Sequence, residues 1–225
     1  MVGNFDGDAR TDLYLTHETP GPGHPDVIVV QSLGFVANPQ TWGGFTQLNY
    51  GGNDDAWDTA NQNEKHFFAG DLDGDQLDDI IGMIIKADGK TISILKVMNV
   101  NGGFNNTDQI QEFTMEDVYD RIELGVGDFD ADGRADIVLS GLDDSGRHDV
   151  YLGKNSPGAG IHPDFQFNST GIRHPDSRAW TSFTLYVKDV STTPGDELLW
   201  VKNTTGNSNV YVATVKELRD NLVLR

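Results

Sequence analysis

An acidic segment of nine residues occurs four times in the chain, and its spacing restricts the fold more than any other feature. The copies are NFDGDARTD, DLDGDQLDD, DFDADGRAD and DVSTTPGDE, which begin at Asn4, Asp71, Asp128 and Asp189. Successive copies start about sixty residues apart, which is the length of one four-stranded propeller blade with its loops. The repeat therefore favours a modular, sheet-built chain.

Short apolar stretches accompany the acidic segments in a common order. One stretch precedes the second, third and fourth copies, and another directly follows every copy. A further stretch comes after a turn rich in Gly, Pro, Asn or Asp, and a weaker one ends the first three units. The alternation within these stretches is typical of β-strands. We therefore predict an all-β fold, a β-propeller built of four-stranded antiparallel blades. About four blades are expected within a single region, 1–225, with approximate boundaries at 1–64, 65–121, 122–181 and 182–225.

The acidic segments themselves have the pattern of a cation-binding loop. Positions 1, 3, 5 and 9 carry side-chain oxygen, and alternate side chains of a tightly turned backbone converge on one centre. The carbonyl of position 7 can complete a set of hard oxygen ligands, which suits calcium better than magnesium. An EF-hand is excluded, because position 12 falls inside the following apolar stretch. The alternative is that Asp and Gly recur only because both favour turns.

In the contexts GNFDGDARTDLYL, GDLDGDQLDDIIG and GDFDADGRADIVL, the loops resemble the FG-GAP/VCBS repeat family of β-propellers, which includes the integrin α-subunit propeller. The resemblance implies that each loop joins the first two strands of a blade and binds calcium. The implied ligands are Asn4, Asp6, Asp8 and Asp12 with the Arg10 carbonyl; Asp71, Asp73, Asp75 and Asp79 with the Leu77 carbonyl; and Asp128, Asp130, Asp132 and Asp136 with the Arg134 carbonyl.

The fourth loop carries fewer charges than the other three. It offers Asp189, Ser191, Thr193, the Gly195 carbonyl and Glu197 as candidate ligands. Because calcium affinity follows ligand charge, we expect three calcium sites and treat this loop as a weaker candidate for a fourth.

The resemblance also raises the question of ring closure, because the family usually has seven blades. An unclosed propeller leaves a partly apolar blade face without a neighbour. We expect that face to be covered by the remaining blades of a longer chain or by a homo-oligomer partner.

Composition limits the partners and the compartment. The formal net charge is −19, from 16 Lys and Arg against 35 Asp and Glu, and this argues against nucleic acid and anionic membranes as partners. No apolar run is long enough for direct membrane insertion, and the amino terminus does not read as a signal peptide. Calcium sites of modest affinity suit the millimolar calcium outside cells, so we expect a secreted or cell-surface protein.

Two long connections opposite the acidic loops are candidates for ligand binding. The first carries Trp57 with Asp54 and Asp55, and the second carries Trp180 with Arg173, His174, Asp176 and Arg178. An aromatic face beside polar groups suits a sugar. The alternative is that the tryptophans pack between blades, because Tyr119 and Trp180 both lie nine residues before a loop.

These features favour a calcium-stabilised extracellular adhesion module that recognises a protein or a glycan. No catalytic motif is recognisable, and the clustered aspartates are assigned to metal. An alternative is the propeller portion of a carbohydrate-active enzyme resembling polysaccharide lyases, which would need a basic residue such as Lys65, Arg173 or His174. A scaffold within a larger toxin or surface protein is a third interpretation.

Overall fold

A computed structural model gives the fold of the chain and shows two compact units, Met1–Thr114 and Met115–Arg225. The structure describes residues 2–7, 12–18, 25–30, 45–49, 65–100, 103–104, 109–119, 121–142, 148–156, 164–170, 183–188, 194–204 and 207–213.

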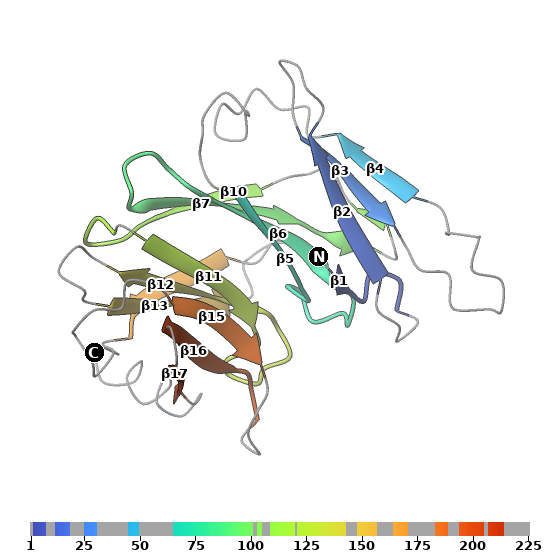
Figure 1. The fold of residues 1–225 in the computed structure, drawn as a ribbon. Helices are drawn as coiled ribbons and strands as arrows, with labels where there is room; N and C mark the ends of the chain where they lie inside the picture. Colours follow the sequence, from blue (N-terminus) through green and yellow to red (C-terminus); the bar gives the residue numbers. More distant parts are fainter. Residues whose placement is uncertain are drawn as a thin grey trace. The chain divides into compact units, whose positions relative to one another are not determined.

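The first unit contains two four-stranded sheets and a short hairpin (Figure 1). One sheet has the order β1-β2-β3-β4, formed by Val2–Gly3, Asp12–Glu18, Pro25–Val30 and Phe45–Asn49. The other has the order β10-β7-β6-β5, formed by Gln109–Thr114, Thr91–Val97, Asp79–Ile85 and Lys65–Gly70. The hairpin pairs β8 (Asn99–Val100) with β9 (Gly103–Phe104).

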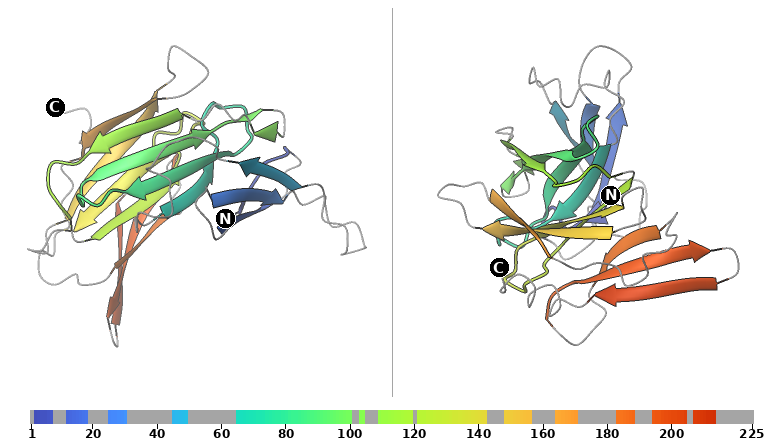
Figure 2. Two further views of the ribbon diagram at one scale, coloured as in Figure 1. Left: turned by 90° about the horizontal axis from the view of Figure 1, so that it is seen from above. Right: turned by 90° about the vertical axis from the view of Figure 1, so that its left-hand side faces the viewer.

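The second unit also contains two antiparallel sheets, of four and three strands among the described residues. One sheet has the order β11-β12-β13-β14, formed by Arg121–Gly127, Asp136–Leu142, His148–Ser156 and Asp164–Ser169. The other has the order β15-β16-β17, formed by Phe183–Lys188, Glu197–Thr204 and Asn207–Ala213. The deep orange to red strands of the latter form a sheet of their own in Figure 2.

Neighbouring strands pair antiparallel in every sheet, so the predicted all-β fold with four-stranded antiparallel sheets is confirmed. None of the residues that the structure describes lies in a helix. Accordingly, the described part of the chain has no helix long and apolar enough to cross a lipid bilayer. Each acidic loop joins the first and second strands of its sheet. The first three loops contain Phe5, Leu72 and Phe129, and the fourth directly precedes β16.

Burial differs between the central and outlying strands. All of β7 and β12, and all but the last residue of β6, are buried, and this includes the polar residues Ser93, Lys96 and Ser140. By contrast, β14 and β15 have alternating exposure; Leu185 is buried while Tyr186 beside it is 54% exposed. The central strands β6, β7 and β12 are therefore buried on both faces, whereas β15 is buried on one.

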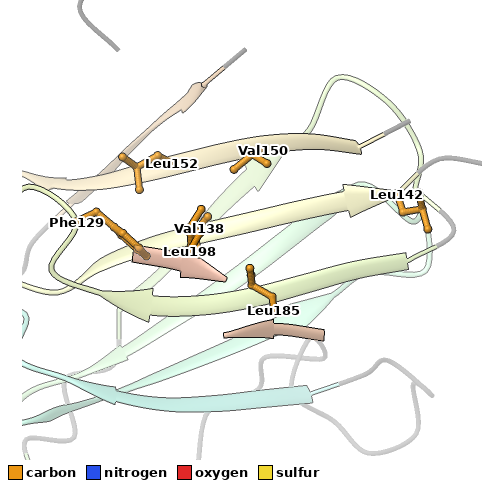
Figure 3. Packing of buried hydrophobic residues seen from close by; sticks show 7 residues of the cluster. All are labelled: Phe129, Val138, Leu142, Val150, Leu152, Leu185 and Leu198. Atoms are coloured by element: carbon orange, nitrogen blue, oxygen red, sulfur yellow. The ribbon is translucent and has the colours of Figure 1, made fainter. Parts of the chain in front are cut away.

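Each unit has an apolar core between its own two sheets. In the first unit, the core joins Phe5 of the first loop to Ile80, Ile84, Leu95 and Val97 of the second sheet. In the second unit, Figure 3 shows Leu185 and Leu198 of β15 and β16 lying against side chains of the neighbouring sheet and its acidic loop, which are Phe129, Val138, Leu142, Val150 and Leu152. The second residue of each loop, Phe5 or Phe129, thus anchors the loop in the core.

Glycine at the sheet interface permits this close packing. Replacing Gly125 of β11 by alanine would place a Cβ 2.6 Å from Val187 Cγ2 and 3.0 Å from Val138 Cγ1. We expect Gly125→Ala to lower the free energy of unfolding by about 1–3 kcal/mol, the usual cost of overpacking, as measured by chemical denaturation. Val187→Ala removes the nearest methyl, so the double variant should be more stable than the sum of the single effects predicts. Strictly additive effects would contradict this packing.

Candidate metal centre

The backbone of the second loop is wrapped around its own carboxylates. Asp71 Oδ1 accepts the N–H of position 4 at 2.6 Å, and its Oδ2 accepts that of position 6 at 2.7 Å. Asp73 and Asp75 each accept the N–H two residues ahead, at 3.2 and 2.8 Å. These bonds turn the side chains at positions 1, 3 and 5 towards the inside of the loop.

The third loop makes similar bonds with a different sequence. Asp128 Oδ2 accepts the N–H of Gly133 at position 6, at 2.9 Å, and its Oδ1 accepts that of Asp132 at 3.1 Å. Asp130 and Asp132 again accept the N–H two residues ahead, at 3.2 and 3.0 Å. The two loops therefore share one conformation, which the Asp spacing determines.

Positions 4 and 6 lie in the left-handed region of the backbone. The φ angles are +84° at Gly74 and +74° at Gln76, and +58° at Ala131 and +84° at Gly133. In the first loop, Gly7 at position 4 has a φ of +78°. Because non-glycine residues adopt this region at a cost, Gln76 and Ala131 indicate that the loop conformation is held by other contacts.

Position 9 is a fully buried acid in each loop. Asp79 is 0% and Asp136 is 1% exposed. Asp79 Oδ2 accepts the N–H of Leu72 at 2.7 Å, and its Oδ1 accepts that of Asn99 at 2.7 Å. Asp136 makes the equivalent bonds with the N–H groups of Phe129 and Asn155, at 3.2 and 2.7 Å. This carboxylate therefore joins the start of the loop to a residue just after β7 in the first unit and near the end of β13 in the second.

Positions 1, 3 and 9 come together in two clusters that could hold a metal ion. Ligand oxygens of Asp71, Asp73 and Asp79 all lie within 4.8 Å of one another, as do those of the second cluster, which are from Asp128, Asp130 and Asp136. Two carboxylates at this separation repel by roughly 3 kcal/mol at an effective dielectric of 20. A divalent cation would remove that repulsion. Asp75 and Asp132, also predicted as ligands, are not in these groups.

Without a cation, burial disfavours the ionised form of the position 9 acids, and this raises their pKa values. Burial raises the pKa of Asp79 to about 8, and the charges of Asp73 and Asp71 add to the shift, although hydrogen bonds from Asn99 and Leu72 oppose it. Burial likewise raises the pKa of Asp136 to about 7. Near neutral pH, each metal-free cluster therefore retains part of a proton at its innermost carboxylate.

Within its described residues, the first loop has the same features as the second and third loops. Asp12 at position 9 is 0% exposed and accepts the N–H of Phe5 at 2.8 Å. Asn4 Oδ1 accepts the N–H of Gly7 at 3.1 Å, as position 1 does in the second loop. Asp6 is half-buried. The other two predicted ligands of this loop, Asp8 and Arg10, lie outside the described residues.

The fourth loop departs from this pattern at position 6. Pro194 stands there, and the proline ring fixes φ near −65°, whereas the second and third loops need about +80°. Glu197 at position 9 is nevertheless 0% exposed, and Gly195 has a φ of +109°. The fourth loop therefore cannot adopt the same conformation. The remaining candidates, Asp189, Ser191 and Thr193, lie outside the described residues.

The predicted ligand-binding residues on the opposite connections all lie outside the described residues; they are Asp54, Asp55, Trp57, Arg173, His174, Asp176, Arg178 and Trp180. Tyr119, which the packing alternative invoked, is buried at 5% exposure. Its hydroxyl donates to Asp149 Oδ2 at 3.1 Å and lies 3.1 Å from that of Tyr151. At this position of the second unit, the aromatic residue is part of the core.

Comparison with known proteins adds no family. No protein-family model matches the chain, and a search of curated proteins finds no match.

Five residues beside the metal clusters were not predicted from the sequence. Asn99 and Asn155 donate to the position 9 aspartates, Lys154 forms an ion pair with Asp130, and two acids at position 8, Asp78 and Asp196, bond to the preceding loop. The repeated Asn, 20 and 19 residues after position 9, was the available sequence signal.

Proposed function

We propose that the chain is a calcium-stabilised propeller segment that acts as an extracellular binding or adhesion module for a protein or glycan. The observation that carries this proposal is the repetition of one loop geometry around two separate acid clusters, each within 4.8 Å. Turn chemistry alone explains Asp and Gly in a loop, but it does not require three carboxylates to converge. Calcium accepts this uneven, flexible oxygen set more readily than magnesium does.

The propeller part of the proposal is supported by the sheets. Four antiparallel meanders follow one another along the chain, and in each an acidic loop joins the first two strands, as the FG-GAP resemblance implies. The exposed outer face of β15 suits a sheet at the end of a packed series, where the next blade or a second copy would dock. The high negative charge, −19, suits a protein that works in calcium-rich surroundings.

Thermal unfolding tests the calcium dependence. A ligand that binds only the folded state, at a hundred times its Kd, contributes about 2.7 kcal/mol, which raises Tm by roughly 5–10 °C for a chain of this size. We expect this rise with calcium, a smaller one with magnesium, and its reversal by a chelator. Binding to immobilised glycans and glycoproteins, with and without calcium, then tests recognition. An unchanged Tm in calcium would contradict the proposal.

Lys154 should weaken the third site relative to the second. Its Nζ forms an ion pair with Asp130 Oδ2, and this contact is the first cause of the raised pKa of Lys154. The equivalent position in the second repeat is Met98. Ile80 of β6 pairs with Val97, the residue before Met98. Ile137 of β12 likewise pairs with Gly153, the residue before Lys154. The ammonium group of Lys154 thus competes with a cation that binds Asp130.

We therefore expect Lys154→Met to raise the calcium affinity of the third loop by about two- to five-fold, the range for a partly exposed ion pair. Calorimetric titration measures the change. Lys188→Met removes the same charge from the exposed end of β15 and serves as the control. Equal effects of the two variants would show that only net charge matters.

A further inference from the structure

The first and second loops are joined by a pair of hydrogen bonds at position 8. The N–H of Asn4, position 1 of the first loop, donates to Asp78 Oδ2 at 2.6 Å, and the N–H of Asp78 donates to the Asn4 carbonyl at 2.7 Å. Asn4 Nδ2 also donates to the Gln76 carbonyl at 3.3 Å. Both peptide groups that flank Asn4 are thereby held by the next repeat. We call this paired contact the latch.

The same latch occurs in the second unit. The N–H of Asp128 donates to Asp196 Oδ2 at 2.8 Å, and the N–H of Asp196 donates to the Asp128 carbonyl at 2.8 Å. The positions and atoms match those of Asn4 and Asp78. A contact that recurs between the same positions of two different pairs of repeats is built into the fold.

The residue before each latch confirms how closely the partners approach. A Cβ at Gly3 would lie 2.7 Å from Asp78 Oδ2, and one at Gly127 would lie 2.6 Å from Asp196 Oδ2. Both separations are shorter than any normal contact, so a side chain at this point would displace the carboxylate of the latch. The remaining position 8 residues are Thr11 and Ala135, and neither carries a carboxylate. The acidic latch is therefore specific to the second and fourth repeats.

The latch holds the backbone of the loop's position 1 residue, whose side chain is a predicted metal ligand. The side chain of Asp128 is one of the three clustered carboxylates, while its backbone is held by Asp196. In the first unit, the network extends to the neighbouring cluster, because Asn99 donates its amide N–H to Asp79 Oδ1 and its Nδ2 to the Phe5 carbonyl at 2.7 Å. The position of one loop thus depends on groups in the next.

We propose that Asp78 and Asp196 are positioning residues for the metal sites of the preceding loops, so that each site's affinity is set partly by the following repeat. This inference rests on the proposed calcium function. Asp196 is the more informative of the two, because Pro194 prevents its own loop from adopting the conformation of the second and third loops. A change at Asp196 therefore acts on the third loop from outside.

Site-resolved calcium titration by NMR tests the proposal on the full chain, with the amides of Gly133 and Gly74 reporting on the third and second loops. Loss of a group that orients a metal ligand commonly lowers affinity about ten- to a hundred-fold, and we expect this at Gly133 in Asp196→Ala. The affinity reported by Gly74 should not change. Asp196→Asn loses the same charge but keeps an oxygen acceptor, so it should restore most of the affinity.

Asp78→Ala makes the matching test in the first unit and remains available if Asp196→Ala fails to fold. Gly7 should report weaker binding in that variant, while Gly133 reports unchanged binding. Wild-type affinity at the affected loops of the alanine variants would overturn the positioning role alone. Equal losses in Asp196→Asn and Asp196→Ala would also overturn it, in favour of simple charge attraction. If no glycine of the wild-type chain responds to calcium, the proposed function fails, and the positioning role fails with it.

Discussion

Asp79→Ala is expected to lower the free energy of unfolding by about 2–6 kcal/mol, even when no metal is present. The variant leaves two buried N–H groups without their acceptor, and each such group costs about 1–3 kcal/mol. These groups are the amides of Leu72 and Asn99, both 2.7 Å from the carboxylate. The loss is large beside the whole stability of a typical domain. Chemical denaturation in a chelator measures it. The variant should also lose calcium binding in the second loop.

Asp73→Ala separates the structural role from the metal role. Asp73 belongs to the same cluster, but it is exposed, and the bond that it accepts from Asp75 is long, at 3.2 Å, and exposed. This variant should therefore change the metal-free stability by less than about 1 kcal/mol, while it weakens calcium binding. Equal metal-free losses in the two variants would contradict the distinct role of position 9.

The metal-free protein is expected to lose stability as the pH rises from about 4 to 8. Asp79 and Asp136 ionise near 3.8 in the unfolded chain, but burial raises their pKa values to about 8 and about 7 in the fold. The folded state therefore binds more protons than the unfolded state in this window, and stability falls with pH by an amount on the order of several kcal/mol. Denaturation in a chelator at pH 5, 6, 7 and 8 measures the slope.

Calcium should remove this slope, because the cation replaces the protons at both carboxylates. Binding near pH 7 is then accompanied by proton release, which calorimetry in buffers of different ionisation enthalpy detects. The double variant Asp79→Asn with Asp136→Asn is the control, since an amide does not titrate. A wild-type slope equal to that of the double variant would show that these two groups do not carry the pH dependence.

The strands and their pairing were predictable because they depend on local alternation. The apolar stretches TISILKV and FTLYVK coincide with β7 (Thr91–Val97) and β15 (Phe183–Lys188). The convergence of positions 1, 3 and 9 was predictable as well, because the loop is short and its geometry is set by its own side chains. The left-handed turns at positions 4 and 6 were not predicted; glycine adopts them at Gly74 and Gly133, but Gln76 and Ala131 adopt them as well.

The contacts that support the loops were not predictable, because they join residues that are distant in the sequence. Asn99 reaches Asp79 only through the register of β6 and β7, in which Ile80 pairs with Val97. Asp78 and Asn4 are 74 residues apart, and no pattern within either loop specifies that they bond. The effect of Pro194 was also hidden, because it depends on the φ angle that the other loops adopt at position 6.

The central claim is that the repeated acid clusters bind calcium, and calorimetric titration of the metal-stripped chain tests it most directly. We predict saturable calcium binding at the second and third loops and also at the first, with affinities between micromolar and millimolar. Asp71→Asn should abolish the second site and Asp128→Asn the third, each without loss of the other. Heats no larger than dilution up to about 10 mM calcium, roughly ten times the weakest Kd of extracellular sites, would contradict the account.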